Sequence, residues 1–188
     1  VARAAGLPVT ILRPPVVYGW RGTWLEEPLR MAERGKMFLL GGGRGTCHPC
    51  YVENLVDATL LAAEHPSAVG RAYIVGDGAS VSFREYFDAV ASLAGLGPIR
   101  RSIPLPVARA TATALEAAAR LSKSTSRPLL THAAIDMVTT KSDMTATRIA
   151  TELGFSPRYS FARAFERLAA EAPARRSGEL EHDLDRRG

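Results

Sequence analysis

Residues 7–19 read LPVTILRPPVVYG, and this stretch decides the fold class of the chain. Its residues 9–12 form a short apolar run rich in β-branched side chains, which predicts a strand buried on both faces, as in a parallel sheet. Pro14 and Pro15 have no N–H group to donate, so we expect strand pairing to stop there. The chain should then leave the sheet at the carboxyl end of the strand, which is the edge where ligands sit in open α/β sheets.

A strand, helix, strand order supports the same fold class farther along the chain. Residues 51–65 carry apolar side chains at spacings of three and four, which predicts an amphipathic helix packed on the sheet. Its expected inward residues are Val52, Leu55, Val56, Thr59, Leu60, Ala62 and Ala63. Residues 72–75 predict the next buried strand, and this order favours a parallel sheet.

Helix-start and helix-stop signals predict several more elements. Ser82 and Glu85 have the spacing of a capping box, in which each residue's side chain accepts from the other's backbone N–H group. Asp143 is expected to cap a helix that ends at Gly154. The helices expected after residue 100 cover 107–121, 131–138, 144–153 and 161–170.

Composition narrows the class of protein. The chain has 188 residues, of which 46% are hydrophobic and 23% charged, and this balance is typical of a globular protein. The formal net charge is +5, but the arginines are scattered rather than gathered on one face with interleaved aromatic residues. We therefore expect no nucleic-acid partner. No run approaches the roughly 18 apolar residues of a membrane span, so a cytoplasmic protein is the default expectation.

Three stretches carry a resemblance to a known family. Residues 6–19, GLPVTILRPPVVYG, resemble the segment that follows the catalytic Tyr-x-x-x-Lys helix in extended short-chain dehydrogenases/reductases. This group comprises the NAD(P)-dependent epimerases/dehydratases and 3β-hydroxysteroid dehydrogenase-like enzymes. Residues 51–58, YVENLVDA, and 152–157, ELGFSP, agree with it in order and spacing. The sequence contains no Tyr-x-x-x-Lys and no opening Gly-x-x-Gly-x-x-Gly turn, so we interpret the chain as the C-terminal half of such an enzyme.

The resemblance implies different roles for successive parts of the chain. Residues 1–75 would be the C-terminal remainder of a Rossmann-type, doubly wound parallel sheet that binds NAD or NADP, with 20–50 contributing to the substrate pocket. Residues 76–172 would form a smaller, mostly helical substrate-binding region. The composition of 173–188, charged and nearly free of large apolar residues, predicts a disordered tail.

The resemblance also implies a function and a set of site residues. The full-length parent would be an oxidoreductase or epimerase acting on a hydroxyl or carbonyl group of a sugar-, sterol- or flavonol-like small molecule. Because its catalytic Tyr and Lys would precede Val1, we assign no catalytic residue here and expect the chain alone to be inactive. The residues expected at the nicotinamide end of the cofactor are Pro14, Val16 and Val17, and those expected to face substrate are Tyr18, Arg21, His48 and Tyr51.

Purely structural positions are the alternatives to these site roles. Val16 and Val17 would also suit a plain core, and His48 would suit a surface position. Many nucleotide-sugar enzymes of the family carry an Arg-Asp pair at about residues 47–48, and its absence here argues mildly against a nucleotide-sugar substrate. Substrate identity, the choice between NAD and NADP, and a homodimer of the full-length parent stay open.

Two motifs compete with the family interpretation. The glycine run 41–45 suggests a phosphate loop, but no Gly-Lys-Ser/Thr follows it, so we expect a turn between two short strands. Cys47-His48-Pro49-Cys50 suggests a thiol-disulfide redox site or a small binding module, because a Cys-x-x-Cys at a helix start lowers a thiol pKa. No thioredoxin-like strand-helix-strand unit precedes it, and no second cysteine pair would complete a zinc site. We expect structural cysteines with ordinary or raised thiol pKa values, and no metal site.

Overall fold

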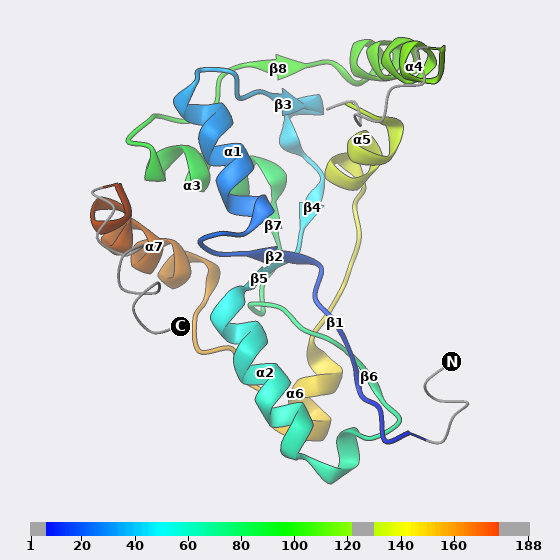
Figure 1. The fold of residues 1–188 in the computed structure, drawn as a ribbon, viewed down its shortest axis with the longest axis vertical. Helices are drawn as coiled ribbons and strands as arrows, with labels where there is room; N and C mark the ends of the chain where they lie inside the picture. The colour runs from blue at the N-terminus through cyan, green and yellow to red at the C-terminus, as the bar shows by residue number, and fades with distance from the viewer. Residues whose placement is uncertain (1–6, 122–129, 177–188) are drawn as a thin grey trace. The chain divides into compact units, whose positions relative to one another are not determined.

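The computed structural model describes residues 7–121 and 130–176. They form two compact units that interleave along the chain (Figure 1). The first unit holds the described residues of Val1–Leu29, His48–Ala79 and Met144–Gly188. The second holds those of Arg30–Cys47 and Ser80–Asp143. Helix α1 (Thr23–Glu33) contributes residues to both units.

The first unit contains two parallel strand pairs. Strand β1 (Ile11–Arg13) pairs with β6 (Ala72–Ile74), and β2 (Val16–Tyr18) pairs with β5 (Pro49–Tyr51). These parallel pairs, alternating with helices, confirm the predicted α/β class.

As expected, the pairing of β1 stops before the two prolines, since its last paired residue is Arg13. The sequence did not predict that pairing resumes just after them in a second sheet. The N–H group of Val16 is free to donate and bonds to the His48 carbonyl at 3.2 Å, so pairing resumes immediately after Pro15 with a different partner strand. Strand β1 is also less buried than expected, because its Ile11 and Leu12 are only half-buried and its Arg13 is exposed. Within the described residues β1 pairs with β6 alone, and this leaves its other edge unpaired.

Helix α2 (Val52–Glu64) exposes most of the side chains that were expected to face inward, although Ala62 is buried as expected and Leu55 packs against the core. Its buried residues are Asn54, Ala58 and Ala62, whereas Val56 and Leu60 are 50% and 57% exposed. Apolar side chains lie on two neighbouring stripes of this helix, so periodicity alone does not determine which stripe is buried. The stripe that contains Asn54 faces inward because the Asn54 amide has hydrogen-bonding partners there.

The remaining helices complete the first unit. A short 3-10 helix, η2 (Pro66–Ala68), follows α2. Helix α6 (Thr147–Leu153) begins later than predicted, and its N-cap residue is Ala146 rather than Asp143, without a side-chain bond. It ends as expected at Gly154, whose φ of +72° suits glycine. The buried apolar cluster of this unit consists of Cys50, Ala58, Ala62, Ala68, Tyr73, Val75, Ile149, Leu153 and Phe155.

The last helix, α7 (Phe161–Arg176), is longer than predicted. It continues past residue 170 and includes Pro173, where we expected the tail to begin. The predicted disorder of residues 177–188 concerns positions outside the described residues.

The second unit is built from shorter strands. Strand β3 (Leu39–Leu40) pairs in parallel with β8 (Ser102–Ile103), and β4 (Thr46–Cys47) pairs antiparallel with β7 (Val81–Ser82). Its helices are α3 (Phe83–Leu93), α4 (Leu105–Leu121) and α5 (His132–Thr139). One apolar cluster consists of Ala32, Met37, Leu39, Ala91 and Ile99, and a second of Ala108, Ala112 and Ile135.

Two local predictions for this unit are confirmed. The Ser82–Glu85 capping box is present with both reciprocal bonds at the start of α3. The glycine run forms a turn, the 3-10 helix η1 (Gly41–Gly43), between β3 and β4. All three of its glycines have positive φ, and a Cβ on Gly43 would come within 2.9 Å of the Arg84 backbone nitrogen, so the turn requires glycine for a structural reason.

Across the described ranges, we find no helix with the length and apolar character needed to cross a bilayer.

Candidate functional site

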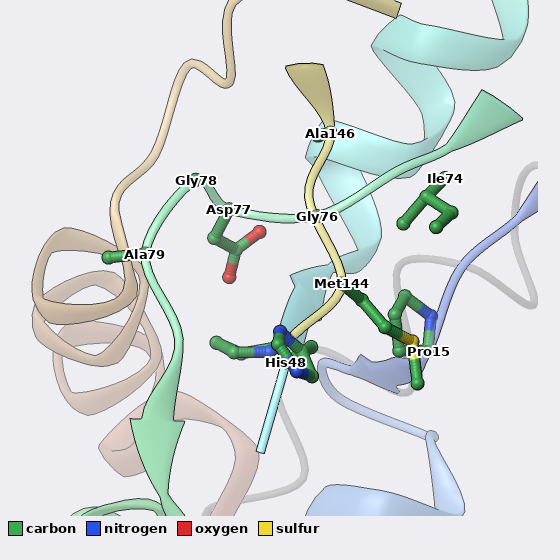
Figure 2. A pocket seen from close by; sticks show the side chains of 10 residues that line it. Pro15, His48, Ile74, Gly76, Asp77, Gly78, Ala79, Met144 and Ala146 are labelled. Atoms are coloured by element: carbon green, nitrogen blue, oxygen red, sulfur yellow. The ribbon is translucent and has the colours of Figure 1, made fainter. Parts of the chain in front are cut away.

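The carboxyl ends of β1 and β6 meet at a small cavity of about 10 Å³, which is room for about one water molecule (Figure 2). Pro15 follows β1 there, His48 precedes β5, and the loop of residues 76–79 follows β6. The side chain of Met144 also lines this cavity. Ligands collect at this edge of open α/β sheets, but a cavity of this size is only a corner of any substrate site.

Asp77 is the buried charged residue at this edge. Its side chain points from the loop after β6 toward the segment that leads into α2 (Figure 2). One carboxylate oxygen accepts from the Tyr51 N–H group at 2.7 Å and from the Asn54 amide at 2.8 Å. The other accepts from the Tyr18 hydroxyl at 2.8 Å. A single carboxylate therefore joins the end of β2 to the start of α2.

Burial dominates the electrostatics of Asp77. The residue is 6% exposed, and desolvation raises the pKa of its carboxyl group above the usual value. The hydrogen bonds from Tyr51, Asn54 and Tyr18 oppose that rise without cancelling it. The folded site thus holds a proton on Asp77 more readily than the unfolded chain would.

Asn54 extends the network to a third segment. Its amide nitrogen donates to the Tyr159 carbonyl at 2.7 Å, and its amide oxygen accepts from the Tyr159 N–H group at 3.0 Å. Asn54 itself is fully buried. These two bonds fix the turn before α7 to the first turn of α2, because an unpaired buried amide would be costly.

An aromatic cluster encloses the Tyr18 side of the network. The Tyr18 ring stacks on Phe165 with centroids 5.4 Å apart, and it lies 5.5 Å from the Tyr51 ring. Tyr51 packs edge-on against Tyr159 at 5.4 Å. Burial, followed by the negative charges of Glu53 and Glu171, raises the pKa of the Tyr51 hydroxyl to about 12. Tyr51 is therefore poorly suited to proton transfer near neutral pH.

The structure brings some of the predicted site residues together. Tyr18 and Tyr51 meet at Asp77, and both are buried. His48 is 8% exposed and lines the cavity. Their contact with a substrate stays a prediction.

The residues predicted to line the cofactor site, Pro14, Val16 and Val17, lie in β2 or just before it, and they differ in burial. Val16 is buried, and the following residue, Val17, is only half-buried. Pro14 is half-buried and immediately precedes Pro15 at the cavity. Their contact with a cofactor is likewise a prediction.

Arg21 stands apart on an exposed turn with unusual backbone geometry. Its φ is +64°, a left-handed value that few residues other than glycine adopt. Its N–H group donates to the Glu26 carboxylate at 2.6 Å, which holds this conformation. Backbone strain of this kind is found preferentially at functional sites, so the φ of Arg21 agrees with its predicted contact with substrate. That contact stays a prediction.

Sequence reasoning missed Asp77, Asn54 and Tyr159. The Gly76-Asp77-Gly78 segment reads as a turn, and Asn54 lies within a helix pattern. One signal was available, namely an acidic residue placed directly after a predicted parallel strand, at the edge where functional groups gather.

The two cysteines lie in strands rather than at a helix start. Cys47 belongs to β4 and Cys50 to β5, and both are buried cysteines. Burial, followed by the negative charge of Asp77, raises the pKa of the Cys50 thiol to about 12. This confirms for Cys50 the expected ordinary or raised pKa, and it is opposite to the activation that a redox thiol needs. The described residues contain no group of three or more potential metal-ligating side chains.

Two curated proteins are similar to this chain in sequence. The 4-hydroxy-2-methyl-3-oxo-4-farnesyl-3,4-dihydroquinoline-1-oxide ketoreductase of Stigmatella aurantiaca is 27% identical over 174 residues, which is 92% of this chain and 52% of that protein. The 2-alkyl-3-oxoalkanoate reductase of Shewanella oneidensis is 24% identical over 170 residues, covering 87% of this chain and 44% of that enzyme. The chain thus spans about half the length of the curated relatives it matches. No protein-family model matches it.

A solved structure has the same fold. The dTDP-glucose 4,6-dehydratase of Streptomyces venezuelae, determined with NAD and TYD bound, superposes with a TM-score of 0.63 at 18% identity. The match covers 94% of this chain and 47% of the dehydratase. At the level of the fold, this similarity confirms the predicted Rossmann-type α/β architecture.

Proposed function

We propose that this chain is the substrate-side part of an NAD(P)-dependent oxidoreductase that acts on a carbonyl or hydroxyl group of a small molecule. The observation that carries the proposal is the joint match of about nine-tenths of the chain to a ketoreductase in sequence and to an NAD-bound dehydratase in fold.

Ketone reduction is the reaction that we favour. Both curated relatives are named as reductases of oxo compounds, and residues 47–48 lack the Arg-Asp pair of many nucleotide-sugar enzymes. A bound NAD(P)H would transfer a hydride to the carbonyl carbon, and an acid would protonate the oxygen. We infer that this acid belongs to the part of the enzyme that precedes this chain.

The chain's own contribution would be one wall of the cofactor site. Strand β2 offers an apolar position, Val17, whose side chain is half-buried, next to Val16, which is buried. An apolar surface of this kind suits one face of a nicotinamide ring and helps to exclude water from it. Pro14 would extend the wall toward the cavity at the strand ends.

The thiol-redox alternative has lost its support. A catalytic thiol must ionise near neutral pH, whereas the pKa of Cys50 is raised to about 12. Both cysteines are also fully buried, which leaves them inaccessible to a disulfide substrate.

A charge placed on the proposed wall tests the function. The protein would be expressed together with any coding sequence that precedes Val1 in the same reading frame, and NAD(P)H binding would be titrated by fluorescence for wild type and for Val17→Asp. A carboxylate beside the nicotinamide in a site with little water should weaken binding at least about tenfold, because an unpaired charge is poorly tolerated there. Circular dichroism should show that the fold persists.

Val69→Asp is the matched control, because Val69 lies in the same unit and is 52% exposed. This variant should bind the dinucleotide like wild type. Equal affinities for Val17→Asp and wild type would remove Val17 from the cofactor site.

A further inference from the structure

The carboxylate of Asp77 lies where three separate segments of the first unit converge. It bonds directly to Tyr18 at the end of β2 and to Tyr51 at the end of β5. Through Asn54 it is linked to the turn at Tyr159 that leads into α7. In addition, the Asp77 N–H group donates to the Pro49 carbonyl at 2.9 Å, so both the backbone and the side chain of this residue hold β5.

These bonds act on the strand that carries the proposed cofactor wall. Val16 and Val17 directly precede Tyr18 in β2, and they lie opposite Pro49 and Cys50 of β5. Both β2 and β5 are only three residues long, so their own ladder supplies few hydrogen bonds. A buried carboxylate that bonds to both strands at their carboxyl ends therefore has a large share in fixing their relative position.

We propose that Asp77 is a positioning residue that fixes the wall of β2 against β5 and thereby sets the affinity for the nicotinamide cofactor. This inference rests on the proposed function for the identity of the ligand. We call the hydrogen bonds that join Asp77 to Tyr18 and Tyr51 the clamp. The clamp is formed by described residues and is testable without a ligand. Asp77 touches neither reacting atom in this proposal, since it acts through Tyr18 and Tyr51.

The experiment compares Asp77→Ala with Asp77→Asn in the protein extended upstream of Val1. Asp77→Ala removes the acceptor for all three donors, so the NADPH dissociation constant should rise about tenfold or more. Asp77→Asn retains a carbonyl for Tyr51 and Asn54 and offers an N–H group to the Tyr18 oxygen, so it should restore affinity to within about threefold of wild type. Amide hydrogen exchange at residues 16–18 and 51 should be faster in Asp77→Ala by about tenfold or more and near normal in Asp77→Asn.

Ile149→Ala separates positioning from simple loss of stability. Ile149 is a fully buried core residue of the same unit, and its truncation destabilises the fold without removing a polar bond. Well below the melting temperature it should leave the dissociation constant for NADPH unchanged. If Ile149→Ala weakens binding as much as Asp77→Ala does, or if Asp77→Asn fails to restore it, the positioning role is wrong.

Hydrogen exchange distinguishes this inference from the proposed function. Wild-type protein that binds no dinucleotide would overturn the proposed function. Exchange at residues 16–18 that is unaffected by Asp77→Ala would overturn the clamp, whatever the protein binds. Faster exchange in Asp77→Ala together with unchanged NADPH affinity would overturn the link between clamp and cofactor.

Discussion

Asp77 in the first unit and Glu116 in the second make the same kind of hydrogen bond at the start of a helix, but they differ in burial. Each carboxylate comes from a distant segment and accepts from a backbone N–H group at the start of a helix, namely that of Tyr51 before α2 and that of His132 in α5. Asp77 also accepts from the side chains of Asn54 and Tyr18, and Glu116 contacts the His132 ring nitrogen Nδ1 at 3.2 Å. Asp77 is 6% exposed, whereas the Glu116 side chain is 27% exposed.

This difference in burial decides what each carboxylate contributes. Glu116 and its partners are only half-buried, so water can replace much of the hydrogen bonding that this carboxylate supplies. Donors that face Asp77 have little access to water, so each of them loses its partner if the carboxylate is removed. Carboxylates with similar hydrogen-bond geometry can therefore contribute differently to the free energy of unfolding. Three measurements test this.

The largest effect is expected for Asp77→Ala. The change leaves the Tyr18 hydroxyl, the Tyr51 N–H group and the Asn54 amide without their acceptor. At about 1–3 kcal/mol for each buried unsatisfied group, the free energy of unfolding should fall by roughly 3 kcal/mol or more. Urea denaturation of the protein extended upstream measures this loss. A decrease below about 1 kcal/mol would mean that water reaches these donors.

A smaller effect is expected for Glu116→Ala, which is the matched truncation at the half-buried site. It removes the acceptor for the His132 N–H group and the contact with the imidazole ring. Exposed pairs and caps of this kind contribute about 0.5–1 kcal/mol. The same urea series should therefore give a loss well below that of Asp77→Ala. Equal losses would contradict the role of burial.

The smallest effect at neutral pH is expected for Asp77→Asn, which stays within about 1 kcal/mol of wild type because an amide can keep all three bonds. The informative measurement is how the difference in unfolding free energy between wild type and Asp77→Asn depends on pH. Burial raises the pKa of Asp77 above 3.8, so its favourable contribution is complete below about pH 4 and declines as pH rises through the raised pKa.

The asparagine variant does not titrate at this position. The unfolding free energy of wild type minus that of Asp77→Asn should therefore decrease between about pH 4 and pH 7. A constant or increasing difference would show that the folded protein does not raise the pKa of this carboxyl group.

Sequence alone predicted the features that depend on local chemistry. The capping box at Ser82 and the left-handed C-cap at Gly154 use contacts between residues a few positions apart. The parallel pairing follows from apolar strands that alternate with helices.

The missed features depend on partners that lie far away in the chain. Tyr18 and Asp77 are 59 residues apart, and Asn54 lies 105 residues from Tyr159. Nothing in the local pattern of α2 distinguishes the stripe of Asn54 from that of Val56, because tertiary hydrogen bonds make the choice. Pairing after Pro15 was missed for a related reason, since a second partner strand was needed to receive it.

The central claim is that this chain supplies one side of a nicotinamide-dependent enzyme. The most direct measurement is a fluorescence titration of NADH and NADPH against two proteins in parallel, the 188-residue chain and the same chain extended by any coding sequence that precedes it in frame. We predict saturable binding of at least one dinucleotide to the extended protein and none to the 188-residue chain. The claim would be contradicted if the extended protein bound neither dinucleotide, or if the 188-residue chain bound one with the same affinity.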